Sequence, residues 1–196
     1  MARSVYFAFH YQRDIFRVQQ VKQHYITKGN YTAAGYFDGS LEEKAKSAGV
    51  DVVKRLIDKG LVGSTVLCVL MGKETSTRHW VYYEIFKSIE SGMGVFGIRI
   101  HQLRDPKTGA DDASSNPFEF SGYGKKEDKL VPMIKYTTGW QDAPNLSTIS
   151  TSAATYLANT DKPILNSLFR IYDWVGDDGY KNFGTWAEAA AKQAGK

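Results

Sequence analysis

The chain has 196 residues, of which 42% are hydrophobic and 23% are charged, and its formal net charge is +4. This length suits one domain with a full hydrophobic core. No run of 18 apolar residues occurs, so we expect no membrane span. The single cysteine, Cys68, excludes an intrachain disulfide and a cysteine metal site. Residues 1–4 lead directly into a predicted strand, so we expect no signal peptide and a cytoplasmic protein.

The basic residues do not form a stripe. Between residues 42 and 59, lysine and arginine alternate with glutamate and aspartate, which is typical of a solvated helix face. No basic segment with interleaved aromatic residues appears, so nucleic-acid binding is disfavoured.

The first elements in chain order are a strand, a helix and a second strand. A buried strand is predicted over 5–9. Asp14 is expected to cap the next helix, whose apolar side runs from Ile15 to Val21. A short second strand is expected near 35–37, inside a loop region rich in glycine.

Two helical segments follow. Ser40 and Glu43 have the spacing of a capping box, which predicts a helix over 40–48. A second, amphipathic helix is predicted over 50–59 and ends at the glycines that come next.

The central segments alternate strand and helix. Strands are predicted over 64–70, 95–100 and 130–136, and a helix over 78–91. Alternation at this spacing favours parallel βαβ units. We therefore predict an α/β fold with a doubly wound, mainly parallel five-stranded sheet and helices on both faces.

The remaining segments are more polar. Residues 103–128 form a polar insert that we interpret as a mobile flap, and 139–161 are interpreted as a linker or loop. Extra C-terminal helices are expected over 164–175 and 185–192. The predicted units are an α/β domain over 1–136 and, over 137–196, a C-terminal linker and helical extension packed on the same domain.

The most informative motif is RHWVYYEI, residues 78–85, which follows a predicted strand and its loop. Open α/β sheets build their sites at the carboxyl ends of strands. Trp80 and Glu84 lie four residues apart and so share one helix face, where an indole could stack on a flat ligand and a carboxylate could stabilise a developing cation. The spacing alone leaves two alternatives open. Glu84 could be a surface residue paired with Lys87, and Trp80 could be a core residue between helix and sheet.

Several proteins of similar fold class are disfavoured. The residues after the first predicted strand are not the Ser/Thr-rich phosphate loop of a flavodoxin, and no G-x-G-x-x-G or P-loop motif occurs. A response-regulator receiver would need a phosphoacceptor aspartate where the third strand ends, but the residues there are Leu70, Met71, Gly72 and Lys73.

Several segments together resemble a known family. The W-x-x-x-E spacing of Trp80 and Glu84 resembles a TIR-domain element, and the match is closer to the TIR-like proteins of bacterial Thoeris anti-phage defence, the ThsB family. The segments that carry the closer match are Phe9–Gln12, Ala33–Asp38, Arg78–Ile85 and Arg170–Val175.

The resemblance implies a TIR-like (flavodoxin-like) fold and an NAD-cleaving glycohydrolase and ADP-ribosyl cyclase. In that family, infection by a phage triggers conversion of NAD into a cyclic ADP-ribose isomer, and this diffusible signal activates an effector protein, ThsA. NAD is then the substrate, with no resident cofactor and no metal. A site shared between protomers would make the protein a homo-oligomer. The alternative is a TIR-like interaction or sensor module without turnover.

The resemblance also assigns roles to individual residues. Glu84 is the predicted catalytic carboxylate, beside the oxocarbenium-like centre of the nicotinamide ribose. For Asp38 and His10 a loop position without a binding role is the alternative. The predicted substrate-binding residues are Phe9, His10, Tyr11, Asp38, Arg78, Trp80 and Tyr83.

Overall fold

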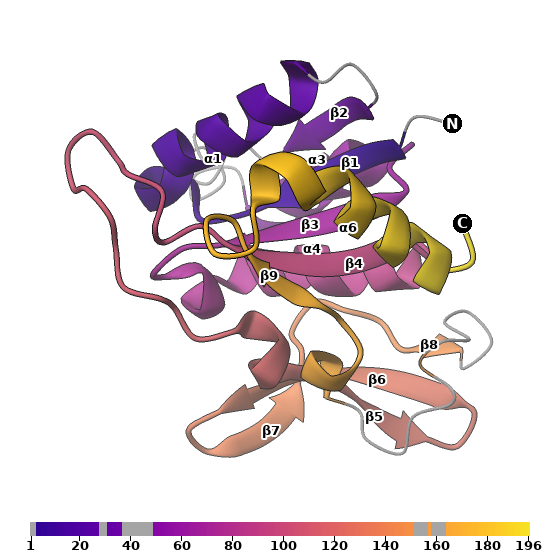
Figure 1. Cartoon of the computed structure of the whole chain (residues 1–196). Coiled ribbons are helices and arrows are strands. Elements are labelled where there is room, and N and C mark those ends of the chain that lie inside the picture. Colours follow the sequence, from indigo (N-terminus) through magenta and orange to yellow (C-terminus); the bar gives the residue numbers. More distant parts are fainter. Residues whose placement is uncertain (1–2, 28–30, 37–48, 151–156, 158–163) are drawn as a thin grey trace.

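A parallel sheet of five strands forms the centre of the fold (Figure 1). The structure is a computed structural model that describes residues 3–27, 31–36, 49–150, 157 and 164–196. The strand order is β2-β1-β3-β4-β9, and each neighbouring pair is parallel. This confirms the predicted doubly wound α/β sheet. The strands are β1 (Arg3–Ala8), β2 (Tyr31–Tyr36), β3 (Val66–Met71), β4 (Gly94–Arg99) and β9 (Ile171–Asp173).

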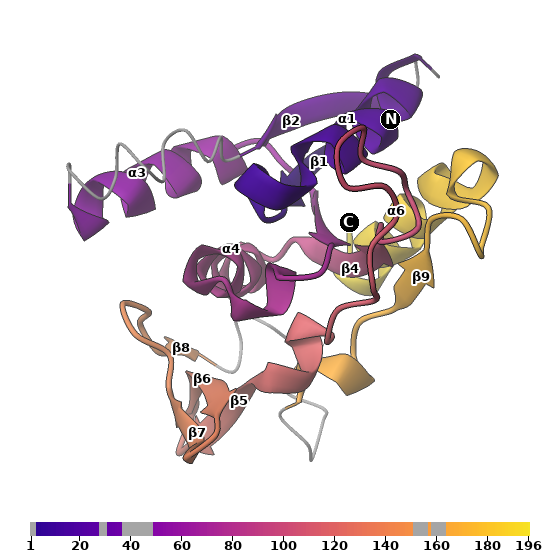
Figure 2. The ribbon, with the colours of Figure 1, turned by 90° about the vertical axis from the view of Figure 1, so that its left-hand side faces the viewer.

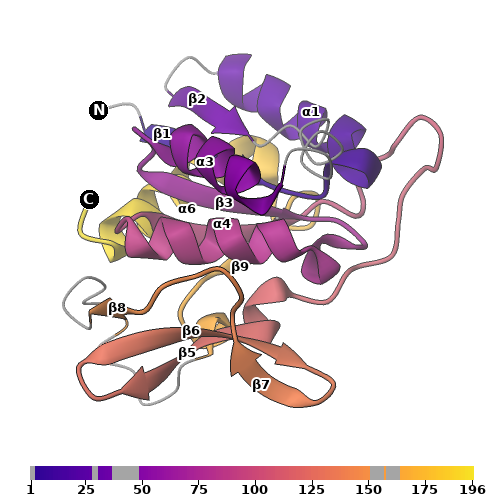
Figure 3. The ribbon, with the colours of Figure 1, turned by 180° about the vertical axis from the view of Figure 1, so that it is seen from behind.

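Helices cover both faces of this sheet. Helices α1 (Tyr11–Thr27) and α6 (Gly179–Gln193) lie on the face seen in Figure 1, and α3 (Val50–Leu61) and α4 (His79–Glu90) lie on the face seen in Figure 3. Successive side chains of a strand point to opposite faces. Two separate cores result, one with Val5 and Phe7 of β1 beneath α1 and α6, the other with Tyr6 and Ala8 beneath α3 and α4.

The chain between β4 and β9 builds a second, antiparallel sheet. Figure 2 shows it beside α4, on the side away from the parallel sheet. The rings of Phe86 in α4 and Tyr123 in β5 meet edge to face, with centroids 5.3 Å apart. The elements are the 3-10 helix η2 (Pro117–Phe120), then β5 (Ser121–Lys126), β6 (Lys129–Tyr136), β7 (Gly139–Asp142) and β8 (Ile149–Ser150).

This second sheet corrects three predictions. The strand predicted over 130–136 exists as β6, but it does not join the parallel sheet. Its residues alternate between buried and partly exposed, which is typical of an antiparallel strand with one solvated face. The segment 103–128, interpreted as a flap, supplies η2 and β5, and 139–161, interpreted as a linker, supplies β7 and β8.

The C-terminal prediction is also wrong in part. The helix predicted over 164–175 is instead the 3-10 helix η3 (Leu165–Ser167) followed by β9, which is the fifth strand of the parallel sheet. The last helix, predicted over 185–192, is the longer α6 and lies in the core. The parallel sheet thus takes strands from both sides of the predicted 136/137 boundary, and the division into two units stays a prediction.

Smaller differences occur near the N-terminus. Helix α1 begins at Tyr11, so Asp14 lies inside its first turn and is not its cap. Helix α3 continues through Gly60 to Leu61. The predicted helix over 40–48, with its capping residues Ser40 and Glu43, lies outside the described residues. Within the described part of the chain, no helix is both long and apolar enough to cross a membrane.

The contact between β4 and α6 gives a stability prediction. A Cβ at Gly94 would overlap with the backbone carbonyl of Ala190 in α6, which cannot move away on its own. We expect Gly94→Ala to lower the free energy of unfolding by about 1–3 kcal/mol, measured by urea denaturation. Gly97→Ala is the matched comparison, because its Cβ would mainly meet the flexible end of Met71. An equal decrease in the free energy of unfolding for both variants would contradict a rigid contact at Gly94.

Candidate functional site

Glu84 lies inside the fold, on α4, with only 2% of its surface exposed. The Tyr6 hydroxyl of β1 donates a hydrogen bond of 2.8 Å to Glu84 Oε1. Helix α3 approaches the same tyrosine at Gly60, where a Cβ would come within 3.0 Å of the ring. The carboxylate is therefore held against the parallel sheet, close to where α3 and α4 cover β1.

The placement of α4 explains this burial. The helix packs against β3 and β4 on one side and the antiparallel sheet on the other (Figure 2 and Figure 3). Glu84 is consequently not a surface residue, and Lys87 pairs with Glu90 instead, at 2.6 Å. A glutamate is almost never this buried unless it has a polar partner. The buried residues of α4 are Val81, Tyr82, Tyr83, Glu84, Ile85, Phe86, Ser88 and Ile89.

Trp80 and Tyr83 lie where α4 faces α3. Trp80 is half-buried, packs against the core, and meets the Tyr83 ring edge to face with centroids 5.7 Å apart. The Tyr83 hydroxyl donates to Asp58 Oδ1 of α3 at 3.1 Å. Burial, and then the charge of Asp58, raise the pKa of Tyr83 well above its usual value, so the phenol keeps its proton. Tyr83 thus links α4 to α3, and Trp80 packs against Tyr83 and the core, which is the packing alternative for Trp80. The substrate-binding roles of both residues stay predictions.

The predicted site residues that follow β1 lie in different parts of the fold. Phe9 and Tyr11 pack in the core beneath α1 and α6, with ring centroids 6.3 Å apart, so they are not brought together with Glu84. His10 is 4% exposed and lies near Glu74, the closest approach being 3.8 Å from Nδ1 to Oε2. Asp38 lies outside the described residues.

Charged residues gather at the carboxyl ends of β1 and β3. Glu74, in the connection from β3 to α4, forms ion pairs with Arg78 and with Arg13 of α1, the latter at 3.3 Å. Arg13 also pairs with Asp111 at 2.8 Å. Of these residues, only Arg78 was predicted from the sequence; Arg13, Glu74 and Asp111 were not. The four-residue spacing of Glu74 and Arg78 was a usable signal, but nothing in the sequence linked either to Asp111.

Asp14 and Arg17 of α1 form a fully buried pair, with Oδ1 3.3 Å from Nη1. The backbone of Gly72 packs so closely on the Asp14 carboxyl that a Cβ there would overlap with it. Burial outweighs the nearby arginines and raises the pKa of Asp14 to about 6. Burial, followed by the charge of Arg78, lowers the pKa of His10 to about 4.

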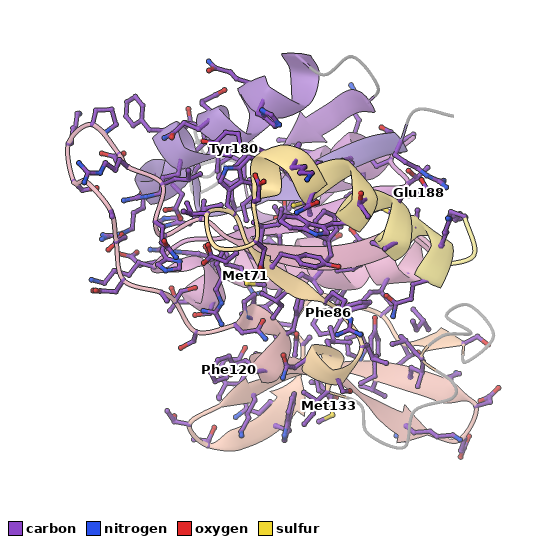
Figure 4. The ribbon with its side chains drawn as sticks, in the orientation of Figure 1. Met71, Phe86, Phe120, Met133, Tyr180 and Glu188 are labelled. Atoms are coloured by element: carbon purple, nitrogen blue, oxygen red, sulfur yellow. The ribbon has the colours of Figure 1, made fainter. Side chains whose placement is uncertain are left out.

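A surface pocket of about 380 Å³ opens beside the N-terminal end of α4. Glu84 does not line it. The pocket lies between η1 (Thr75–Thr77), η2 and β6, and Figure 4 labels Phe120 on its wall. Its lining residues are Ser76, Thr77, His79, Tyr82, Ser115, Phe120, Ile134, Lys135 and Tyr136. In the part of the chain that is described, no group of three or more His, Cys, Asp or Glu residues is placed to hold a metal ion.

Comparison with known proteins identifies the family. Residues 6–105 match the family model described as "Thoeris protein ThsB, TIR-like domain". A protein of Bacillus cereus (strain MSX-D12), named "Putative cyclic ADP-D-ribose synthase ThsB1", is 42% identical over 197 aligned residues, which cover 95% of this chain and 99% of the relative. The chain belongs to the Thoeris ThsB family of TIR-like proteins. The ThsB match runs from β1 past β4, so it contains Tyr6, Trp80 and Glu84, and it confirms the family resemblance.

His10 and Asp14 are both buried, and their contributions to stability should change in opposite directions as pH falls. Between pH 6.5 and about 4, unfolded His10 binds a proton that the folded state excludes, so its contribution to stability is lost as pH falls. Between pH about 6 and 3.8, folded Asp14 holds a proton that the unfolded state releases, so its contribution grows as pH falls.

The two contributions therefore oppose each other in the intact protein. We expect the free energy of unfolding of His10→Gln to fall less steeply on acidification than that of the wild type. The free energy of unfolding of Asp14→Asn should fall more steeply than that of the wild type. Urea denaturation between pH 4 and 7 measures both slopes. Parallel pH profiles for all three proteins would show that neither group titrates in this window.

Proposed function

We propose that this protein is a TIR-type enzyme that cleaves the nicotinamide–ribose bond of NAD and cyclises the product to a cyclic ADP-ribose isomer. The single observation that carries the proposal is the Glu84 carboxylate, enclosed at 2% exposure and hydrogen-bonded by Tyr6. The name of the Bacillus cereus relative, a cyclic ADP-D-ribose synthase, supports the same chemistry.

The proposed role of Glu84 is electrostatic. Breaking the bond to nicotinamide develops positive charge on the ribose, as in glycoside hydrolysis. A carboxylate held in a site of low dielectric stabilises that charge more strongly than one in water. Tyr6 is the proposed positioning residue, because its hydroxyl fixes Glu84 Oε1 at 2.8 Å.

Cyclisation also requires that water be excluded. A hydroxyl group of the same substrate must attack the anomeric carbon in place of a water molecule. The enclosure of Glu84 suits this requirement, since only 2% of its surface is exposed. Because Glu84 itself is enclosed, a sugar can reach it only after the surrounding elements part. We infer that this opening is the step controlled by a phage-derived trigger.

The proposal includes a downstream partner. The cyclic product is a diffusible signal that activates an effector protein, as the ThsB family resemblance implies. An active site shared between protomers, and hence a homo-oligomer, belongs to the same proposal.

A second candidate function is a TIR-like interaction or sensor module without turnover. The enclosure of Glu84 and the packing of Trp80 on the core favour it, because both features also suit a purely structural helix. The substitution Glu84→Gln separates the two candidates.

Glu84→Gln keeps the size of the side chain and removes its charge. We expect NAD loss and nicotinamide release to fall about 10²–10³-fold, as when a preorganised electrostatic group is removed. Lysates of phage-infected cells that express each variant are the assay material, with products measured by mass spectrometry. Glu90→Gln, at the C-terminal end of the same helix, is the control and should keep wild-type turnover. If neither wild type nor Glu84→Gln forms an ADP-ribose product, the interaction-module candidate replaces the enzyme.

Tyr6→Phe removes only the hydroxyl that holds Glu84. We expect the protein to stay folded, and the rate at saturating NAD to fall about tenfold, equivalent to one hydrogen bond to a charged group. The concentration of NAD at half-maximal rate should change little, because Tyr6 orients the carboxylate and does not bind NAD. A wild-type rate for Tyr6→Phe would show that the hydrogen bond does not position Glu84 for catalysis.

A further inference from the structure

The Glu74 carboxylate pairs with Arg13 and Arg78 at the point in the parallel sheet where the order of the strands reverses. The order β2-β1-β3 places this switch point between the carboxyl ends of β1 and β3, the position at which open α/β sheets bind ligands. Glu74 follows β3, Arg78 is the residue just before α4, and Arg13 belongs to the first turns of α1. Two segments, the β3–α4 connection and α1, therefore supply charges to one spot.

The geometry is that of an occupied anion site. One oxygen of Glu74 pairs with Arg78 and the other with Arg13, whose Nη1 lies 3.3 Å from Oε1. Planar guanidinium groups suit phosphate as well as carboxylate. All three side chains are about one third exposed, so an anion from solvent can reach them.

His10 lies behind this cluster and offers unused hydrogen-bonding capacity. Its side chain is 4% exposed, and neither ring nitrogen has a hydrogen-bond partner. The 3.8 Å from Nδ1 to Glu74 Oε2 is too long for a hydrogen bond. Leaving a buried polar group without a partner costs about 1–3 kcal/mol. A ligand oxygen at the position of the Glu74 carboxylate would have an imidazole nitrogen close by.

The charge balance also favours an incoming anion. Among the residues that the structure describes, the cluster holds four basic and four acidic side chains, so displacement of Glu74 leaves an excess of positive charge around Arg13 and Arg78. An anion that takes its place restores the balance. The basic residues are Arg13, Arg17, Lys73 and Arg78, and the acidic residues are Asp14, Glu74, Asp111 and Asp112.

We propose that Arg13, Arg78 and His10 form a diphosphate-binding site, and that Glu74 occupies this site until a ligand displaces it. The inference rests on the proposed function, because it assigns the site to the diphosphate of the dinucleotide whose ribose reaches Glu84. The positions are compatible: Arg78 precedes Glu84 by six residues, about 9 Å along a helix, and His10 follows Tyr6 by four residues, about 13 Å along an extended chain. One extended dinucleotide spans such a separation.

Glu74 acts in this arrangement as an internal competitor. A ligand that must first displace a bound group has its affinity reduced by the fraction of molecules in which the site is closed. Removing the charge of Glu74 frees both arginines, so it strengthens binding of an anion although it deletes two ion pairs. A purely structural Glu74 would give the opposite result, since its loss would loosen Arg13 and Arg78.

The test is binding of inorganic pyrophosphate to the full chain, measured by isothermal titration calorimetry at low ionic strength. We expect Glu74→Gln to bind pyrophosphate about tenfold more tightly than the wild type, a difference of about 1.4 kcal/mol. Adding Arg13→Ala or Arg78→Ala to Glu74→Gln should weaken binding at least about tenfold relative to Glu74→Gln alone. Glu74→Ser is the second variant if Glu74→Gln does not fold.

Glu188→Gln is the matched control. Glu188 also holds an arginine, Arg3, at 2.7 Å, but at the far end of the sheet (Figure 4), and its loss changes the net charge equally. It should leave pyrophosphate affinity unchanged. Pyrophosphate affinity in Glu74→Gln equal to or weaker than the wild type, or equal tightening by Glu188→Gln, overturns the inference.

The same assay separates this inference from the proposed function. Pyrophosphate contains no glycosidic bond, so Glu84→Gln should bind it as the wild type does. If turnover fails to depend on Glu84 but Glu74→Gln still tightens pyrophosphate binding, the anion site stands and the enzyme proposal falls. If turnover depends on Glu84 but pyrophosphate binding does not change in Glu74→Gln, the enzyme proposal stands and the anion site falls.

Discussion

The hydrogen bond from Tyr6 to Glu84 is the interaction on which this account depends. It joins the first strand of the sheet to α4, which has a sheet on either side. Removing a carboxylate from water is costly unless a polar partner replaces the water. The fold therefore retains a buried acid that an apolar residue of similar size would replace at lower cost, which is typical of a position kept for chemistry.

Strand β1 organises the rest of the site through its alternation. Tyr6 points toward α3 and α4, and Val5, Phe7 and Phe9 pack beneath α1 and α6, while His10 lies beside Glu74. The family resemblance assigns Phe9 and His10 to the same substrate-binding site. The period of two in a strand separates them, and this could have been predicted from the sequence.

Much of the parallel sheet could be predicted because its segments are long, apolar and regularly spaced. Strand β9 could not, since it has only three residues and the surrounding apolar residues Leu165, Leu168, Phe169 and Tyr172 repeat with a helical period. Tertiary contacts decide its conformation: Tyr172 stacks on Trp186 of α6 at 4.2 Å between ring centroids. The long-range ion pairs of the site could not be predicted either, since Arg13 and Asp111 are 98 residues apart.

The most direct test of the central claim is a crystal structure of Glu84→Gln with NAD bound, since the substitution slows turnover and keeps the shape of the side chain. We expect the amide at position 84 to contact the nicotinamide ribose, with a heavy-atom separation of about 3–3.5 Å from the sugar. A dinucleotide that binds in any assembly with its nicotinamide ribose remote from residue 84 would contradict the account.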